Sequence, residues 1–148
     1  MIYRTATIND LEQLATLFDN YRVFYKKPSD MIQSRLFLKE RIQKNESEIY
    51  VAENEKQALV GFVQLYPIFS STRLKRLWLL NDLYVLPNFR SQGISIELIN
   101  KAKELCVTTN ACGLQLETAK TNLIGNQLYP KTGFVLEEDT HFYTWNME

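Results

Sequence analysis

One stretch of the sequence decides the fold: Leu83-Tyr84-Val85-Leu86-Pro87-Asn88-Phe89-Arg90-Ser91-Gln92-Gly93-Ile94-Ser95. It begins within an apolar run, residues 78–86, which only Asn81-Asp82 interrupts. Such a run predicts a central strand covered on both faces, and Pro87-Asn88 ends it. From Gly93 the apolar residues recur at helical spacing. The stretch therefore predicts a strand, a turn and a helix N-terminus in succession.

The turn within this stretch has the composition of an anion-binding site. Unpaired N–H groups and a partial positive charge at a helix N-terminus favour a diphosphate. Small residues at Gly93 and Ser95 would let the backbone approach the phosphate oxygens. Residues 90–95 therefore indicate an anion site after a strand. A generic turn would explain Gly93 equally well, and spacing alone leaves both interpretations open.

The rest of the chain predicts further helices and strands of an α+β fold. We expect other strands at residues 2–6, 48–53, 58–66, 114–118, 134–136 and 142–145. We expect helices after caps at Asn9 (with Glu12 completing a capping box) and Ser29-Asp30, from Gly93, and over residues 122–129. This order predicts one domain, residues 1–148, with a mixed central sheet flanked by helices on both faces.

Composition excludes several classes of protein. The chain has 148 residues, 45% hydrophobic and 23% charged, as is ordinary for a globular domain. Seventeen basic residues balance seventeen acidic ones, so no strong field favours nucleic acid or an anionic membrane. We see no signal peptide and no membrane span, and we expect a cytoplasmic protein. Cys106, Cys112 and the lone His141 indicate neither a disulfide framework nor a metal site.

Two separate motifs resemble the GNAT acetyltransferases. Residues 90–95, RSQGIS, resemble the family's [RQ]-x-x-G-x-[GA] signature, with Ser95 in place of the usual Gly or Ala. Residues 122–134 resemble its N-x-x-A-x-x-L-Y-x-x-x-G-F segment, with Gly125 at the Ala position. Pro130 follows Tyr129, which biases that tyrosine away from regular helix. Other segments look closest to bacterial members and to the polyamine, thialysine and yeast histone/D-amino-acid acetyltransferase branch.

This resemblance implies an acetyl-CoA-dependent N-acetyltransferase that uses no metal. The acceptor would be a primary amine (a small molecule, an amino acid, a polyamine-like compound or a peptide or protein) that attacks the thioester directly. A homodimer is compatible with the resemblance, which implies neither a nucleic-acid nor a membrane partner. The cofactor-binding residues that it implies are Leu83, Tyr84, Val85, Arg90, Ser91, Gln92, Gly93, Ile94, Ser95 and Asn122.

The resemblance also places catalytic and acceptor residues. Tyr129 would protonate the departing thiolate, since a phenol with a pKa near 10 keeps its proton at neutral pH. Asp82 would help to bind and deprotonate the amine, or else it holds a basic partner. Phe24 and Tyr25 would line the acceptor site, although aromatic residues between helices also serve as core.

Two other functions fit parts of the sequence. A non-catalytic acyl-CoA-binding module would keep residues 90–95 and would not depend on Tyr129 or Asp82. A nucleotide-binding domain would explain the glycine turn, but a P-loop lysine, a further glycine and the Rossmann strand order are missing. The basic residues Arg73, Lys75 and Arg76 could meet a phosphate or simply be solvated, and we favour the second.

Overall fold

The computed structural model describes residues 1–147, which form two compact units, residues 1–117 and the part from Thr118 onward. The first unit contains β1 (Ile2–Thr5), the 3-10 helix η1 (Ile8–Asp10), α1 (Leu11–Phe24), α2 (Met31–Gln43), β2 (Glu48–Glu53), β3 (Leu59–Ser70), β4 (Lys75–Val85), the 3-10 helix η2 (Pro87–Phe89), α3 (Ile94–Thr108) and β5 (Leu114–Gln115). The second unit contains α4 (Leu123–Lys131). Within residues 1–147, no helix has the length and apolar character needed to cross a bilayer.

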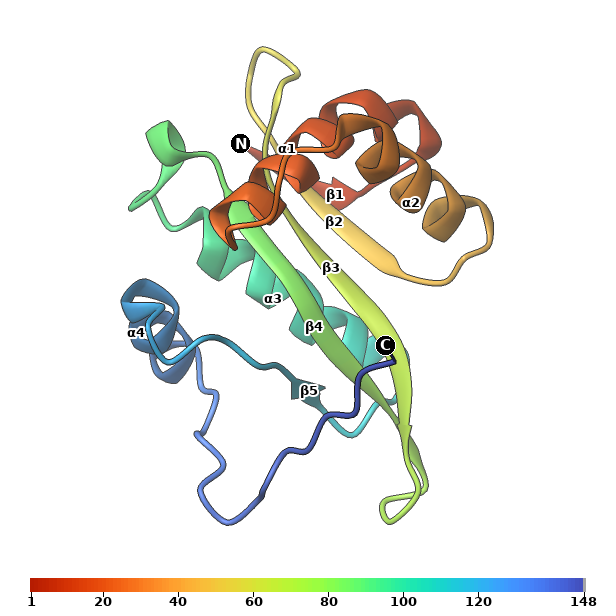
Figure 1. The fold of residues 1–148 in the computed structure, drawn as a ribbon, viewed down its shortest axis with the longest axis vertical. Helices are drawn as coiled ribbons and strands as arrows, with labels where there is room; N and C mark the ends of the chain where they lie inside the picture. The colour runs from red at the N-terminus through yellow and green to blue at the C-terminus, as the bar shows by residue number, and fades with distance from the viewer. Residues whose placement is uncertain (148) are drawn as a thin grey trace. The chain divides into compact units, whose positions relative to one another are not determined.

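A mixed sheet forms the centre of the first unit, as predicted, and it has five strands in the order β1-β2-β3-β4-β5. Strands β1 to β4 are antiparallel neighbours, and β5 lies parallel to β4. β5 pairs only with Trp78 and Leu79, so it accompanies one end of β4 (Figure 1). From Asn81 to Val85, β4 therefore has no strand neighbour on that side within the described chain. The backbone groups on this edge remain available to other partners.

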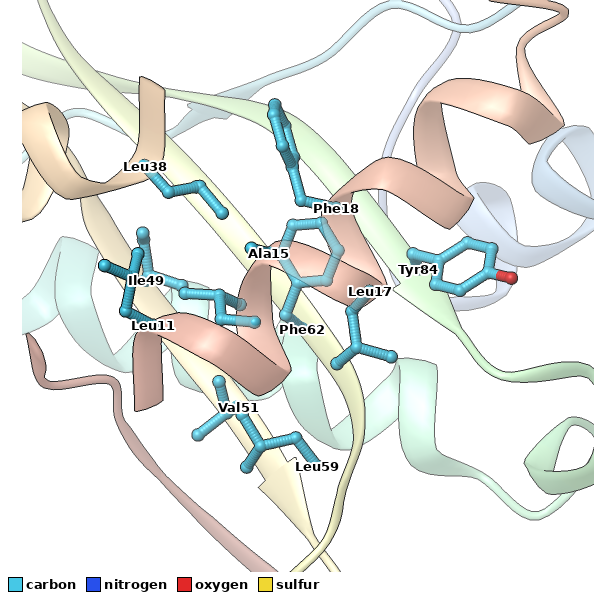
Figure 2. Packing of buried hydrophobic residues seen from close by; sticks show 11 residues of the cluster. Leu11, Ala15, Leu17, Phe18, Leu38, Ile49, Val51, Leu59, Phe62 and Tyr84 are labelled. Atoms are coloured by element: carbon cyan, nitrogen blue, oxygen red, sulfur yellow. The ribbon is translucent and has the colours of Figure 1, made fainter. Parts of the chain in front are cut away.

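Helices cover both faces of the sheet, which confirms the predicted α+β arrangement (Figure 1). Phe62 and Tyr84 are register partners on β3 and β4, and both belong to the apolar cluster formed with α1 and α2 (Figure 2). Gly61 faces the opposite side, because successive side chains of a strand alternate. A Cβ added to Gly61 would lie 3.4 Å from the Leu98 side chain of α3. An added Cβ would lie closer still, 3.0 Å, to the Tyr84 carbonyl oxygen, so the glycine mainly permits the close approach of β4.

A β-bulge at Asn81 shifts the register of the β3–β4 ladder. Gln64 pairs with Asp82, whereas the next residue of β3, Leu65, pairs with Leu80. Asn81 is therefore an extra residue on β4, and such an insertion changes which face the following side chains point to. Asp82 faces α1 together with Gln64, while Leu80 faces α3 together with Leu65.

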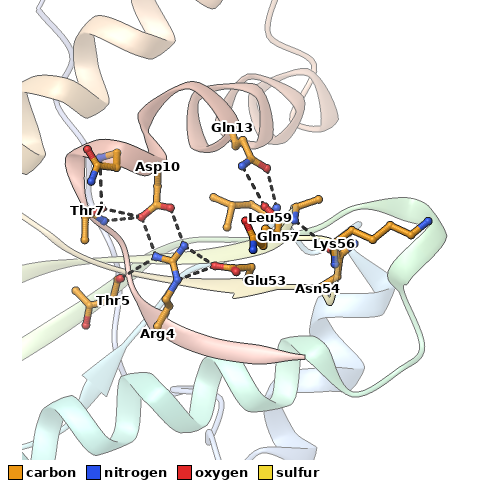
Figure 3. Close-up of polar contacts among 12 residues, drawn as sticks. Arg4, Thr5, Thr7, Asp10, Gln13, Glu53, Asn54, Lys56, Gln57 and Leu59 are labelled. Carbon is orange, nitrogen blue, oxygen red and sulfur yellow. Dashed lines mark hydrogen bonds and ion pairs between the residues drawn. The ribbon is translucent and has the colours of Figure 1, made fainter.

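The first helical segment begins at a different cap from the one that the sequence predicts. The Thr7 hydroxyl accepts from the Asn9 N–H at 3.3 Å, and the Asp10 carboxylate accepts from the Thr7 N–H at 2.7 Å (Figure 3). The capping box is therefore Thr7–Asp10, and the predicted Asn9–Glu12 box is wrong. The extra 3-10 turn moves the start of the segment towards the N-terminus, and Glu12 is left 71% exposed beside Arg35.

Asp10 also anchors the helix start to the sheet. Its two carboxylate oxygens accept from both Nη atoms of Arg4, at 2.8 and 2.7 Å, in a bidentate pair (Figure 3). The Nε of Arg4 donates to Glu53 on β2 at 2.8 Å. The pKa of the Asp10 carboxyl lies below its usual range, chiefly because Arg4 hydrogen bonds to the charged form. One guanidinium thus ties β1, β2 and η1 together.

Several predicted strand boundaries are wrong. Residues 132–147 contain no strand, although strands were expected at 134–136 and 142–145, and apolar side chains there, such as Trp145, are largely exposed. Alternating apolar residues favour a strand only where neighbouring side chains offer packing, so the pattern alone is insufficient. β5 stops at Gln115 rather than at residue 118. β3 and β4 extend further than predicted, to Ser70 and from Lys75, so only residues 71–74 connect them.

We predict that Asp10→Ala lowers the free energy of unfolding by about 2 kcal/mol at pH 7, because it removes both the cap and the charged hydrogen bonds. Since the folded-state pKa of Asp10 is depressed, this stability is present above the ordinary pKa of about 3.9 and is lost as the pH falls through the folded value. Urea unfolding at pH 7 and at decreasing pH measures it. Glu12→Ala is the matched control and should change stability by less than about 0.5 kcal/mol. Equal losses in the two variants would restore the predicted Asn9–Glu12 box.

Candidate active site

The predicted anion site is a tight loop between β4 and α3. η2 follows the strand, and Ser91 and Gly93 then adopt left-handed backbone angles, with φ of 60° and 79°. Gly93 is the N-cap residue of α3. A Cβ on Gly93 would meet no atom within 4 Å. The positive φ therefore favours glycine at position 93, and the space beside it is free for a ligand.

The backbone N–H groups of residues 91–95 make no hydrogen bond to any group of the described chain. The first paired amides of α3 are those of Ile96 and Glu97, which donate to the Gly93 carbonyl at 3.0 and 3.1 Å. A row of unpaired amides at a helix N-terminus binds anions well. The buried side chain of Ile94 leaves only its backbone available. Among the side chains of this loop, those of Ser91 and Gln92 are exposed and that of Ser95 is half-buried.

Arg90 fixes the start of this loop. Its Nε donates to the Val85 carbonyl at 2.9 Å. The guanidinium carbon lies 5.5 Å from the ring centroid of Tyr84 and 5.7 Å from that of Phe24. Within the described chain, the two Nη groups have no hydrogen-bond acceptor. The structure thus brings predicted cofactor residues together with Phe24, which was predicted to line the acceptor site.

The open edge of β4 presents the backbone of Leu83 and Val85. The Leu86 N–H donates to the Val60 carbonyl at 2.9 Å, so this residue turns its backbone towards β3. Backbone groups alternate along an antiparallel strand, and those of Leu83 and Val85 therefore point to the other edge. The bond from Arg90 to Val85 agrees with this direction. The side chain of Tyr84, by contrast, lies in the core and its backbone points towards β3, so it can act on a cofactor only through Arg90.

Asp82 is a buried carboxylate with neutral hydrogen-bond partners. Its side chain accepts from Gln64 Nε2 at 2.7 Å and from Asn81 Nδ2 at 3.0 Å, and Ser47 donates to Gln64 Oε1 at 2.9 Å. No ion pair of the described chain includes Asp82, so the alternative role of holding a basic partner has no support. Burial raises the pKa of Asp82, and hydrogen bonds from Gln64, Tyr21 and Asn81 oppose this shift.

An aromatic wall, defined as Tyr21, Phe24 and Tyr25, lies beside this carboxylate. The Tyr21 hydroxyl donates to the Asn81 carbonyl at 3.2 Å, which joins α1 to the bulge. The Tyr25 ring packs edge-on against Tyr21 at 4.9 Å and against Phe24 at 5.2 Å. Phe24 is 48% and Tyr25 36% exposed. Both are therefore surface residues rather than core.

The second predicted motif lies in the second unit, where Asn122 caps α4. Its side chain accepts from the Gly125 N–H at 3.1 Å and donates to Thr118 at 2.9 Å. A Cβ on Gly125 would lie 2.6 Å from Asn122 Nδ2 and 3.2 Å from the Tyr129 ring. Glycine at the family's Ala position is thus explained by this cap. Asn122, predicted to touch the cofactor, is engaged by its own helix and by Thr118 before it.

Tyr129 lies inside regular helix, so the expected distortion before Pro130 is wrong. α4 continues through Pro130 to Lys131. The Tyr129 carbonyl accepts from the Thr132 N–H and hydroxyl, at 3.1 and 3.0 Å, and from the Phe134 N–H at 3.0 Å. These bonds stabilise Tyr129 in helical backbone dihedral angles, which a following proline disfavours. The Tyr129 ring is half-buried and packs edge-on against Phe134.

Sequence reasoning missed Ser47, Gln64, Tyr21 and Tyr66 as neighbours of Asp82. Burial, followed by the charge of Asp82, raises the pKa of Tyr66 well above its usual value. Gln64 carried a usable signal, since it is the polar residue within the apolar run 59–65 of β3. A polar side chain in such a run requires a buried partner. Residues 1–147 hold no group of His, Cys, Asp and Glu placed to bind a metal ion.

Comparison with known proteins gives a consistent result. The sequence pattern described as the acetyltransferase (GNAT) family matches residues 11–134. The N-acetyltransferase YhfO of Bacillus subtilis is 41% identical over 142 residues, which cover 96% of this chain and 93% of the relative. A crystal structure of a probable acetyltransferase superposes with a TM-score of 0.94 at 38% identity, covering 100% of this chain and 99% of the other. The mouse thialysine N-ε-acetyltransferase is 30% identical over 89 residues, 59% of this chain and 52% of the relative.

We predict that Asp82→Asn raises the melting temperature at pH 8, by about 2–4 °C for each kcal/mol of charge burial that is relieved. Because the folded-state pKa of Asp82 is raised, its penalty is present above that pKa and disappears as the pH falls to the ordinary value of about 3.9. The difference from the parent should therefore shrink towards pH 4. The new amide can be accommodated if the Gln64 amide turns over, since the Ser47 hydroxyl can donate or accept.

Calorimetric melting curves from pH 4 to 8 measure this effect. Glu55→Gln, which neutralises an exposed carboxylate, should leave the melting temperature unchanged. A less stable Asp82→Asn variant at pH 8 would mean that the hydrogen bonds to the carboxylate outweigh its burial.

Proposed function

The chain belongs to the acetyltransferase (GNAT) family, and on that premise we propose that it transfers an acetyl group from acetyl-CoA to a primary amine by direct attack. It is an N-acetyltransferase of that family. One observation carries the proposal: β4 holds a buried carboxylate, Asp82, and leads directly into a loop of unpaired amides at residues 91–95. A carboxylate that can accept a proton thus lies on β4, and an anion-binding loop follows at the end of the same strand.

The loop residues fit a diphosphate of coenzyme A. Unpaired amides at the N-terminus of α3 and the free Nη groups of Arg90 supply donors and positive charge. The space beside Gly93 admits the group. Leu83 and Val85 would hold the pantetheine arm through their backbone at the open edge of β4. Bound there, the thioester would supply an activated acetyl group.

Asp82 is suited to remove the proton of the acceptor. An alkyl ammonium has a pKa of about 10.4, so only roughly one molecule in a few thousand is neutral at pH 7. A carboxylate with a raised pKa binds a proton better than an exposed one does. Its neutral partners leave the negative charge uncompensated, which favours a cationic amine nearby. We propose that the proton passes to Asp82 directly or through one water molecule.

The aromatic wall would line the acceptor site. Phe24 and Tyr25 offer half-exposed rings, and Tyr21 connects them to the bulge beside Asp82. Rings of this kind attract alkyl ammonium groups. The thialysine acetyltransferase among the relatives is named for an ε-amine, and this agrees with a small aliphatic amine. Polyamines, amino acids, aminoglycosides and peptide N-termini, assayed for release of coenzyme A, would identify the acceptor.

We predict that a hundredfold excess of acetyl-CoA over its Kd stabilises the parent by about 2.7 kcal/mol, whereas Gly93→Val loses most of this effect. Valine at a positive φ distorts the loop, and its branched side chain occupies the ligand space. Thermal shift with NADH and ATP as comparison ligands measures the stabilisation. Gly113→Val is the matched control, because Gly113 also has a positive φ and free space but precedes β5. A parent that does not respond to acetyl-CoA would defeat the proposed function.

We predict that Tyr129→Phe reduces kcat on the order of a hundredfold, with little change in KM for acetyl-CoA, because it removes the proposed proton donor to the thiolate and keeps the ring. Steady-state kinetics with the amine found in the panel measure both constants. Tyr143→Phe, a change at an 85% exposed ring in the same unit, should leave kcat unchanged. A Tyr129→Phe variant within about twofold of the parent would remove the tyrosine from the mechanism. If acetyl-CoA binds and no amine is acetylated, the non-catalytic binding module is favoured.

A further inference from the structure

The Arg90 side chain contacts both sides of the proposed active site. Its Nε bonds to the Val85 carbonyl, and its guanidinium lies over the Tyr84 ring, so it is fixed to β4. The same guanidinium lies 5.7 Å from the ring centroid of Phe24, the last residue of α1. One cation thus joins the loop at residues 87–93 to the end of α1.

Phe24 lies between the cofactor loop and the residues around Asp82. The three residues after it, 25–27, form the tight end of α1, with amides that donate to the carbonyls of Tyr21, Val23 and Arg22. Phe24 also packs on Tyr25, whose ring contacts Tyr21 at the bulge. A continuous series of ring contacts therefore leads from Arg90 to the surroundings of Asp82.

The contact with Phe24 limits how Arg90 can move. A planar guanidinium held by one hydrogen bond can still rotate about that bond. Aromatic rings packed beside it limit the orientations that the guanidinium plane can take. The backbone of Arg90 is extended, and that of Ser91 after it is left-handed. The direction of the loop is therefore set at Arg90. Fixing that residue lowers the entropy lost when the loop closes on a ligand.

We infer that Phe24 is a positioning residue for coenzyme A, acting through Arg90, and that the cofactor loop and the end of α1 stabilise each other. This inference rests on the proposed function. Phe24 belongs to the proposed acceptor wall, and through Arg90 its ring would also affect the affinity of the loop for the cofactor. Through this contact, a ligand that orders the loop also restricts the end of α1, and the coupling free energy between the two segments is reciprocal.

Coenzyme A binding by calorimetry tests the inference. Phe24→Leu should raise the Kd about two- to fivefold, the value of a partly exposed cation–π contact. Phe24→Tyr keeps the ring and should bind as the parent does. Phe37→Leu is the matched control, because Phe37 is 38% exposed and lies 4.6 Å from the Arg41 guanidinium, on α2 rather than near the loop. It should leave the Kd unchanged.

A double-mutant cycle separates a contact through Arg90 from a general packing effect. Arg90→Gln, the other residue of the GNAT signature at this position, should weaken binding, and Phe24→Leu should then cause no further loss. Hydrogen exchange gives a second readout, since coenzyme A should slow exchange of the amides of residues 25–27 in the parent and less in Arg90→Gln. An unchanged Kd in Phe24→Leu, or the same loss with and without Arg90, overturns the inference. Failure of the parent to bind coenzyme A would instead defeat the proposed function.

Discussion

The β-bulge at Asn81 is the constraint on which the site depends. Without the extra residue, Leu80 and Asp82 would face the same side of the sheet, because side chains of a strand alternate. With it, Leu80 packs under α3 while Asp82 turns towards α1 and meets Gln64. The insertion also brings the Asn81 carbonyl to Tyr21. A one-residue change of register would therefore move the carboxylate into the wrong layer of the protein.

The site places a negative charge and an anion-binding loop at different points of β4 and the loop that follows it. At its end, β4 leads to unpaired amides and the Arg90 guanidinium, which favour an anion. Only eight positions before Arg90, Asp82 carries a buried negative charge with neutral donors around it. This polarity would orient acetyl-CoA with its diphosphate at the loop, and it would draw a cationic amine towards Asp82. The sheet edge between them is left without a strand neighbour in the described chain.

The sequence predicted local structure correctly where a residue type has a single physical reason to occur at its position. Gly93 predicted a turn into a helix, and its positive φ confirms why a glycine is needed. The pair Asn81-Asp82 marked an interruption in an apolar strand, but only pairing with β3 shows that one residue is a bulge and the other buried. The network around Asp82 joins Gln64 of β3, Ser47 behind it in the loop before β2, and Tyr21 of α1 at the Asn81 carbonyl, and such long-range contacts leave little trace in local spacing. The start of the first helical segment and the conformation before Pro130 were predicted wrongly for a local reason, since the Thr7–Asp10 capping box and the bonds from Thr132 to the Tyr129 carbonyl outweighed the preferences read from the sequence.

The cap of α4 has an evolutionary consequence. Asn122 occupies the volume that a side chain at position 125 would need, at 2.6 Å from an added Cβ. An alanine, the family's usual residue there, is tolerated only after the asparagine adopts another rotamer. The two positions are therefore epistatic: substitution at one changes which residues are acceptable at the other. The acceptable residues at position 125 therefore depend on where the Asn122 amide nitrogen lies, while the cap itself uses the amide oxygen.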